Sequence, residues 1–386
     1  MQIELPISKS IANRLLILQA MHRDGLSAVS ACGCFDLPDD VLLLHHALTA
    51  IHRHSPSFTA INHLNLGNCG TAMRFLTAYC AQLPDQTTIL DGVERMRQRP
   101  IGQLVDALRE IGAKIEYLGQ EGFPPLRISG CQLDLQKPVR INNPLSTQFV
   151  SALLLIGANV QTNSVSPYID ITRALIEQYS TLHRHSPSFT ALHHLERDWS
   201  SAAFWYEHVA LYGGEIYLPG LSRDSLQGDK VVADIFAQLG VQTTYTPDGI
   251  VISKTDDNFA ERGREFLSRF LSNDRQSRTI AAQVVDVVVN KHITQDFSAC
   301  PDLYPAVALT CERLGITLHA TGTDSLPIKE SDRLLAVRQH LTCHDHRMAM
   351  ALLVAGYPID DTDCIRKSYP QFLQQYLPTL KNICIH

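Results

Sequence analysis

The sequence predicts an α/β protein, because short apolar strands alternate along it with amphipathic helices. One order recurs: a strand, a turn containing Gly, Asn or Ser, and then a helix. Two stretches illustrate it, namely His63–Leu66 leading through Gly67–Thr71 into Ala72–Gln82, and Val139–Ile141 leading through Asn142–Ser146 into Gln148–Ala158. A length of 386 residues leaves room for two or three domains with ample cores.

Two helices can be placed closely. In the first, Met73, Leu76, Thr77 and Cys80 recur at helical spacing. The second begins with Pro100 in its first turn and carries apolar residues through to Ile111. Gly112 is expected to end this helix, and Lys114–Leu118 then alternates as a strand.

Composition excludes several classes of protein. A net charge of −6 argues against a general binder of nucleic acid or membrane surfaces, because both favour a basic excess. No apolar run is long enough to span a membrane, and the first residues carry no secretory pattern, so we expect a cytoplasmic protein. The ten cysteines are scattered and expected to stay reduced, and the pair Cys32 and Cys34 is weak support for a metal site. The Gly-rich nucleotide-binding motifs of Rossmann and P-loop proteins are absent.

A nine-residue segment occurs twice without change, as His52–Ala60 and as His183–Ala191. We interpret both copies as exposed loops that enter a strand in two equivalent units. A histidine-rich metal site is the alternative, and the sequence gives no functional reason for the identity of the copies.

Cations, hydroxyls and amides gather at helix starts and turns. Each cluster alone could be a cap or a solvated surface, and a run of three arginines is usually surface. Together they indicate that an acidic protein concentrates positive charge locally, as a cleft for a multiply anionic small molecule would require. The clusters are Ser8–Arg14, Gly67–Thr71, Arg95–Pro100, Asn142–Gln148, Ile328–Arg333, His344–Arg347 and Arg366–Lys367.

The order of these and further motifs resembles that of the EPSP synthase family over nearly the whole chain. The matching segments are Ser8–Arg14, Pro38–Val41, Leu66–Arg74, Arg95–Leu108, Ser146–Leu155, Pro167–Thr172, Glu196–Phe204, Cys300–Ala308, Ile328–Leu334, Asp345–Met350 and Cys364–Phe372. Eleven motifs in the family's order are far more specific than any one of them.

The resemblance implies a fold of two domains, each built of three βαβαββ units, with the active site in the cleft between them. It places residues 9–196 in one domain and residues 1–8 together with 197–386 in the other. The match begins almost at residue 1, where relatives usually have a longer leading strand.

The resemblance also implies the reaction: transfer of the enolpyruvyl group of phosphoenolpyruvate to the 5-hydroxyl of shikimate 3-phosphate, with release of phosphate. The residues that match the family's phosphoenolpyruvate site are Lys9, Gly70, Arg99, Gln148, Arg333, Arg347 and Lys367. Those that match its shikimate 3-phosphate site are Lys9, Ser10, Arg14, Ser146, Thr147, Gln148, Tyr168, Asp302, Ser325 and Lys329.

Addition followed by elimination needs a base near the hydroxyl and an acid near the methylene carbon. By the resemblance we expect Asp302 as the base and Glu330 as the acid, the latter with a pKa raised toward neutrality. Lys9, His346 and Lys367 are expected to assist proton and charge transfer. No metal or organic cofactor is implied, and a monomer is the family expectation. Because Gly70 is retained, we also expect glyphosate to compete with phosphoenolpyruvate.

Several positions depart from the family's pattern. Thr147 replaces a serine and keeps the hydroxyl. Val165 replaces a serine that contacts the substrate phosphate in the family, and it has no hydroxyl. Ser164 or Ser166 would have to supply this contact instead. Ser325 stands where an asparagine is common. Cys69 and Phe75 replace an alanine and a proline around the glycine turn.

Three alternatives remain at this point. The sister enzyme, UDP-N-acetylglucosamine enolpyruvyl transferase, typically has Lys-Asn near its start and a reactive cysteine in a loop. Here Ser10 follows Lys9, and residues 119–125 contain no cysteine. A catalytically inactive anion-binding homologue would be expected to lose some of Lys9, Asp302, Glu330 and Lys367, and all four are present. The chain could also be one domain of a larger fused polypeptide.

Overall fold

The computed structural model describes residues 1–22, 37–53, 61–183, 195–255 and 292–383. Both copies of the duplicated segment fall largely outside the described residues, as do Cys32 and Cys34, so their interpretations stay untested. The remaining elements alternate between helix and strand, which confirms the predicted α/β class.

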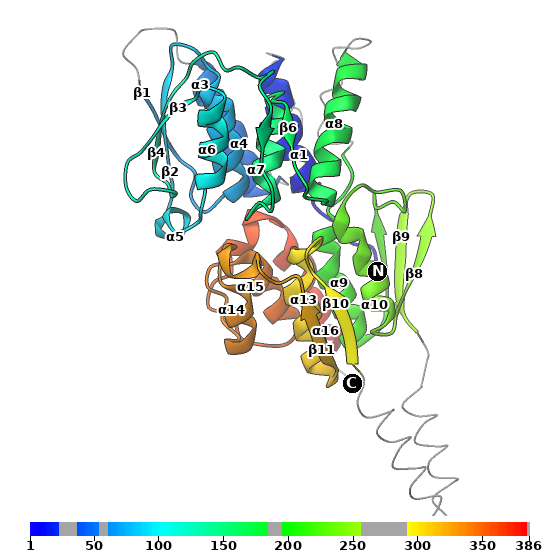
Figure 1. The fold of residues 1–386 in the computed structure, drawn as a ribbon. Helices are drawn as coiled ribbons and strands as arrows, with labels where there is room; N and C mark the ends of the chain where they lie inside the picture. The colour runs from blue at the N-terminus through cyan, green and yellow to red at the C-terminus, as the bar shows by residue number, and fades with distance from the viewer. Residues whose placement is uncertain (23–36, 54–60, 184–194, 256–291, 384–386) are drawn as a thin grey trace, which may run out of the picture.

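The first half of the chain forms the upper part of the molecule in Figure 1. Its helices are α1 (Lys9–Met21), α3 (Asp39–Arg53), α4 (Gly70–Ala81), α5 (Glu94–Arg97), α6 (Gly102–Glu110), α7 (Thr147–Leu155) and α8 (Pro167–His183). Its strands are β1 (Ile61–Asn65), β2 (Thr87–Asp91), β3 (Lys114–Tyr117), β4 (Leu126–Ser129), β5 (Val139–Arg140) and β6 (Val160–Gln161).

The second half forms the lower part of Figure 1. Its helices are α9 (Trp199–Tyr212), α10 (Val232–Ala237), α13 (Tyr304–Leu314), α14 (Arg333–Gln339), α15 (His346–Val354) and α16 (Phe372–Ile383). The short 3₁₀ helices are η2 (Gly228–Val231), η3 (Pro301–Leu303), η4 (Leu326–Ile328) and η5 (Asp363–Lys367). The strands are β7 (Glu215–Pro219), β8 (Val241–Thr246), β9 (Gly249–Lys254), β10 (His292–Asp296) and β11 (Thr317–Thr321).

One βαβαββ unit is complete in each half. In the first, β1-α4-β2-α6-β3-β4 gives a sheet ordered β1-β2-β4-β3, with β1 parallel to β2 and the other pairs antiparallel. In the second, Gln2 bridges Tyr217 in parallel, and α9, β7, α10, β8 and β9 follow in the same order and pairing. The two halves therefore share a repeating architecture.

Local sequence explains the element ends. Gly112 has a φ of 103°, which an L side chain rarely adopts, and its N–H donates to the carbonyl of Arg109 at 3.0 Å, so it ends α6 as predicted. In β1 the burial alternates along the strand, because only one face meets the helices.

The apolar side chains form two separate cores. One runs from Ile7 to Tyr179, and the other joins Ile3 and Leu5 to residues between Trp199 and Tyr376. The chain passes from one core to the other twice, near Ser8 and near Glu196. These two segments lie side by side, because the N–H of Ser8 donates to the carbonyl of Glu196 at 2.9 Å. These cores support the proposed domains, residues 9–196 and residues 1–8 with 197–386, except that Ile7 packs in the first core.

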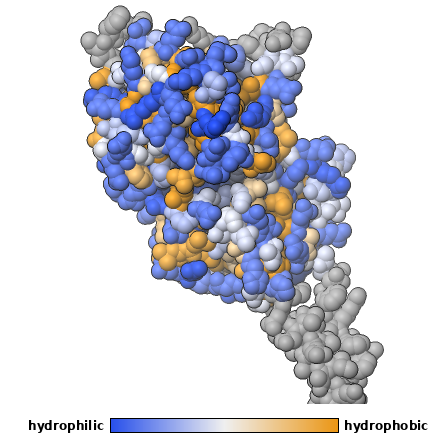
Figure 2. Space-filling model, viewed as in Figure 1, coloured by the Kyte–Doolittle hydropathy of each residue, from blue (hydrophilic) through white to orange (hydrophobic). Residues whose placement is uncertain are grey.

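Most of the surface visible in Figure 2 is hydrophilic on both domains, and hydrophobic residues occur in scattered patches. No helix in the described ranges is long and apolar enough to cross a membrane. In the same ranges, His, Cys, Asp and Glu side chains nowhere gather in threes as metal ligands would.

Glu207 on α9 is fully buried, and neither carboxylate oxygen has a hydrogen-bond partner among the described residues. Burial raises the pKa of Glu207 well above its ordinary value. The folded protein therefore holds a proton there that the unfolded chain releases above pH of about 4.3, and stability falls as pH rises toward the folded-state pKa.

We expect Glu207→Gln to raise the thermal midpoint at pH 8, by about 2–4 °C for each kcal/mol recovered, and to leave it nearly unchanged at pH 5. Differential scanning calorimetry at both pH values measures this, with Glu215→Gln on the exposed start of β7 as the control. An equal pH dependence in the wild type and Glu207→Gln would contradict the prediction.

Candidate active site

A cavity of about 310 Å³ lies between the two domains. Every residue assigned to the site from the sequence lines it except Lys367, whose Nζ lies 3.2 Å from a carboxylate oxygen of Glu330, itself a lining residue. The structure thus brings together residues separated by more than 350 positions in the chain, while their individual roles stay predictions.

The cavity concentrates positive charge. Its lining contains seven lysines and arginines and four carboxylates, in a chain with a net charge of −6. The first residues of α1, α4, α7 and α8 line it from one domain, and those of α14 and α15 line it from the other. Helix N-termini present free N–H groups and partial positive charge, so this convergence favours anions.

Lys9 and Arg14 extend from the first turns of α1. The Nζ of Lys9 lies 2.8 Å from Asp40; burial alone would lower the pKa of Lys9, but Asp40 raises it. Arg14 is almost fully buried and donates to the hydroxyls of Thr172 and Ser151 and to backbone carbonyls. It has no carboxylate partner in the described structure, and burial lowers its pKa to about 10.

Two further arginines, Arg74 on α4 and Arg99 between α5 and α6, lie beside Gly70 at the cavity. Arg74 donates to the carbonyls of Gly70 and Pro100, and its pKa is lowered to about 9 by burial and by nearby Arg99. Arg99 donates to the backbone and side-chain oxygens of Asn68 and lies 3.7 Å from Glu330 across the domain boundary.

Asp302, at the start of η3, is surrounded by three cations. Its two oxygens lie 2.7 Å from Arg333 and from Arg347, and Lys329 lies 3.6 Å away. Burial alone would raise the pKa of Asp302, but Arg347, Lys329 and Arg333 hold it well below its ordinary range. The carboxylate is therefore ionised at neutral pH, as a base must be.

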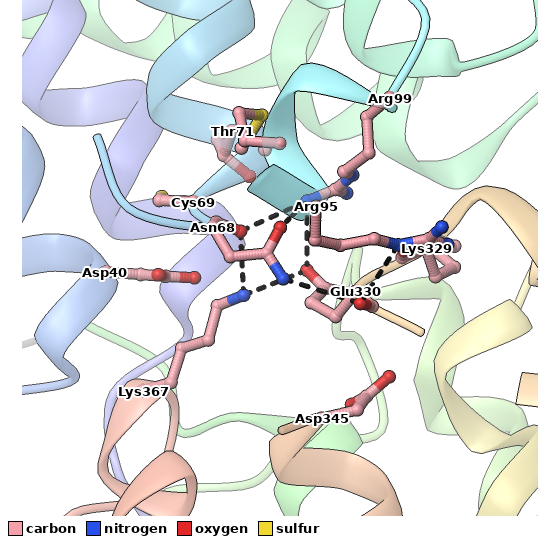
Figure 3. A network of polar contacts seen from close by, with 12 residues as sticks. Asp40, Asn68, Cys69, Thr71, Arg95, Arg99, Lys329, Glu330, Asp345 and Lys367 are labelled. Carbon is pink, nitrogen blue, oxygen red and sulfur yellow. Dashed lines mark hydrogen bonds and ion pairs between the residues drawn. The ribbon is translucent and has the colours of Figure 1, made fainter. Parts of the chain in front are cut away.

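Glu330 is similarly enclosed. Lys367 lies 3.2 Å away and Arg99 3.7 Å (Figure 3). Arg333 lies 3.1 Å away. Burial would raise the pKa of Glu330, yet these cations hold it well below its ordinary range. The raised pKa expected for Glu330 is thus wrong for this structure. Arg333 lies three residues on, but the sequence could not show that Lys367 and Arg99 from two other segments also meet this carboxylate.

The first residues of α15 form the part of the cavity wall that contains His346 and Arg347. Asp345 is fully buried, caps the helix by accepting from the N–H of Arg347, and accepts from the Nε of Arg333 at 2.8 Å. Burial, with Lys9 and Lys367 nearby, lowers the pKa of His346 well below its ordinary value, so its imidazole is neutral.

Several buried donors around the cavity have no partner within the described residues. They are the Nε and Nη1 of Arg347 and the Nε of Arg99 and of Arg74. The neutral ring of His346 adds one nitrogen that donates and one that accepts, and neither makes a hydrogen bond with a described residue. Leaving such groups unpaired costs about 1–3 kcal/mol each, and more when they are charged. A bound anion would relieve that cost.

The other wall is polar and largely uncharged. Ser146 caps α7, and the amide of Gln148 donates to the hydroxyl of Thr71 at 3.0 Å. Burial keeps the pKa of Tyr168 well above its ordinary value, so the phenol stays protonated. Val165 is 94% exposed at this wall. Ser164 and Ser166 both line the cavity, and the Ser166 hydroxyl accepts from the N–H of Tyr168, so which of them replaces the lost serine stays a prediction.

Sequence reasoning assigned no role to several residues that the site uses. Asp40, Asn68, Arg74, Arg95 and Asp345 all lie in segments that carried the family resemblance. The available signal was therefore their place inside those motifs. Arg95 and Arg99 both reach Glu330, because Arg95 donates to its backbone carbonyl and Arg99 lies 3.7 Å from its carboxylate.

The fold and the site define a two-domain enzyme that holds anionic small molecules between its domains. The model of the EPSP synthase (3-phosphoshikimate 1-carboxyvinyltransferase) family matches residues 1–343 and 338–376, and the chain belongs to this family. It is accordingly a transferase of the shikimate pathway.

Relatives cover nearly the whole chain. The 3-phosphoshikimate 1-carboxyvinyltransferase of Bacteroides fragilis is 35% identical, over 96% of this chain and 93% of its own length. That of Paraburkholderia phymatum is 31% identical, over 97% and 95%. The fold is similar to a solved EPSP synthase from Acinetobacter baumannii, with a TM-score of 0.59 and 18% identity over 98% of this chain and 95% of that one.

Gly70 is expected to tolerate no side chain without loss of phosphoenolpyruvate binding. A Cβ there would lie 2.6 Å from the Nη2 of Arg99 and 2.7 Å from the Nη1 of Arg74, so both guanidinium groups would have to move. We predict that Gly70→Ala raises the KM for phosphoenolpyruvate by about tenfold, with a smaller effect on kcat.

Steady-state kinetics with each substrate varied measures this change. Gly119→Ala is the matched control, because its Cβ would meet only Pro125 at 3.5 Å. An unchanged KM for phosphoenolpyruvate in Gly70→Ala would contradict the proposed location of that substrate.

Proposed function

We propose that the cavity binds shikimate 3-phosphate and phosphoenolpyruvate together and transfers the enolpyruvyl group between them. The observation that carries this proposal is the set of buried, unpartnered donors on Arg74, Arg99, Arg347 and His346 around one cavity. Two substrates with several negative charges would satisfy those donors.

Phosphoenolpyruvate is assigned to the cationic end, on Lys9, Arg99, Arg333, Arg347 and Lys367, with Gln148 and the Gly70 backbone beside them. Arginine forks match the planar carboxylate and the phosphate. Shikimate 3-phosphate is assigned to the other wall, on the residues Ser10, Arg14, Ser146, Thr147, Gln148, Tyr168, Ser325 and Lys329. Hydroxyls, amides and Asp302 suit a polyhydroxylated ring with a single phosphate.

In the addition step, the 5-hydroxyl oxygen bonds to the enol carbon of phosphoenolpyruvate, and Asp302 receives the hydroxyl proton. Glu330 gives a proton to the methylene carbon, which becomes a methyl group. In the elimination step, the methyl group returns a proton to Glu330, the double bond re-forms, and phosphate leaves with the proton that Asp302 had received. Each carboxylate must therefore change its protonation state during the cycle.

Substrate anions would supply the pKa change that Glu330 needs. Phosphate and carboxylate groups on Lys367, Arg99 and Arg333 would compete with Glu330 for those cations. Once these cations also interact with the substrate anions, they stabilise the Glu330 carboxylate less. The effect of burial on Glu330 then outweighs their effect, and the pKa of Glu330 rises. The same competition at Arg333 and Arg347 would make Asp302 a stronger base.

The two rival functions are less well supported. All the relatives described above are 3-phosphoshikimate 1-carboxyvinyltransferases, and none is the UDP-N-acetylglucosamine enzyme. The residues that an inactive binder would lose are present, and Asp302 and Glu330 line the cavity. A monomeric state, a cytoplasmic location and independence from any cofactor stay predictions.

The direct test follows inorganic phosphate release from purified protein. Release is expected only when both substrates are present, and replacing shikimate 3-phosphate by UDP-N-acetylglucosamine should abolish it. Glu330→Ala and Asp302→Ala should each lower kcat by about 10²–10⁴-fold, while Glu215→Gln should leave it unchanged.

Two results would overturn the proposal. Release with UDP-N-acetylglucosamine would favour the sister enzyme. Thermal stabilisation by both ligands without any release would favour an anion-binding homologue.

A further inference from the structure

Arg95 lies in the arginine run for which solvated surface is the ordinary expectation, yet its side chain crosses the domain boundary. Its guanidinium donates to three backbone carbonyls of the opposite domain: Pro327 at 2.8 Å, Lys329 at 3.0 Å and Glu330 at 3.3 Å. Figure 3 shows it directed at the segment that carries Lys329 and Glu330.

These carbonyls are suitable partners for a cation. They belong to the end of η4 (Leu326–Ile328) and to the two residues after it. The last carbonyls of a helix lack partners within the helix and carry partial negative charge, and an arginine can satisfy them. Arg95 therefore caps this helix from the other domain.

Neighbouring residues strengthen the same connection. The side-chain amide of Asn68 donates to the carbonyl of Glu330 at 3.4 Å, and the backbone carbonyl of Asn68 accepts from Lys367 at 2.9 Å. Arg95 itself makes no ion pair with any described residue, so its charge is directed at the carbonyls alone. Arg97, two residues on, instead pairs with Asp91 on the surface at 2.7 Å.

We propose that Arg95 is a positioning residue: by holding the carbonyls of residues 327–330 from the opposite domain, it fixes Glu330 and Lys329 against the substrates when the domains are together. It touches no reacting atom, and this inference rests on the proposed function. Loss of the Arg95 side chain should affect the placement of Glu330 more than the binding of shikimate 3-phosphate. Most residues assigned to shikimate 3-phosphate lie in the same domain as Arg95, and the contacts of Arg95 do not hold them.

The test compares Arg95→Ala and Arg95→Lys with the surface control Arg97→Ala. Arg95→Ala is expected to lower kcat by about tenfold or more, while the Kd for shikimate 3-phosphate stays within about twofold. Arg95→Lys should recover part of kcat, because an ammonium group donates to fewer of the three carbonyls than a planar fork does. Arg97→Ala should match the wild type.

A second measurement does not depend on turnover. Small-angle X-ray scattering of the ligand-free proteins should give a larger radius of gyration for Arg95→Ala than for the wild type and Arg97→Ala, because the connection between domains is weakened. Equal radii together with an unchanged kcat in Arg95→Ala would overturn the proposal. So would a Kd for shikimate 3-phosphate that weakens as much as kcat falls, because that pattern indicates general disruption.

The two proposals fail in different ways. If the wild type releases no phosphate, the proposed function fails, and the scattering comparison alone decides whether Arg95 holds the domains together. If the wild type is active and Arg95→Ala behaves like Arg97→Ala in both measurements, only the role of Arg95 fails.

Discussion

The structure depends on a shared set of cations. Arg333, Arg347 and Lys329 surround Asp302, and Lys367, Arg99 and Arg333 surround Glu330. Burying so many charges is tolerable only because each has an opposite charge nearby. The anions of the substrates need the same cations, so binding and the protonation of the two carboxylates cannot be independent. In this account, arrival of substrate converts Glu330 from an ionised ion-pair partner into an acid.

The fold makes this arrangement possible by bringing helix N-termini from both domains to one cavity. The starts of α1, α4, α7 and α8 supply hydroxyls, amides and cations from one side, and α14 and α15 supply Arg333, His346 and Arg347 from the other. Neither domain holds a complete site. The contacts of Asn68 and Arg95 with the segment around Glu330 show how closely the two incomplete halves must fit.

The sequence allowed much of this to be predicted, for definable reasons. Gly112 and the apolar stripe after Gly70 act locally, so the end of α6 and the position of α4 could be predicted. The placement of Pro100 in the first turn of α6 was wrong, because this helix begins at Gly102. The site residues could be named because they lie within long motifs, and all but Lys367 line the cavity. The depressed pKa of Glu330 could not be predicted, because Lys367 and Arg99 approach it only in the folded chain. The direction of Arg95 could not be predicted either, because the carbonyls it contacts lie more than 200 positions away.

The central claim is that substrate anions take cations away from Glu330, and proton uptake on binding tests it most directly. Isothermal titration calorimetry in buffers of different ionisation enthalpy would measure net proton uptake at neutral pH. The ligands would be shikimate 3-phosphate and a phosphonate analogue of phosphoenolpyruvate that cannot lose its phosphate. The account predicts that the wild type takes up about one proton more than Glu330→Gln. Equal uptake by the two proteins would show that Glu330 does not change its protonation state on binding, and would contradict the account.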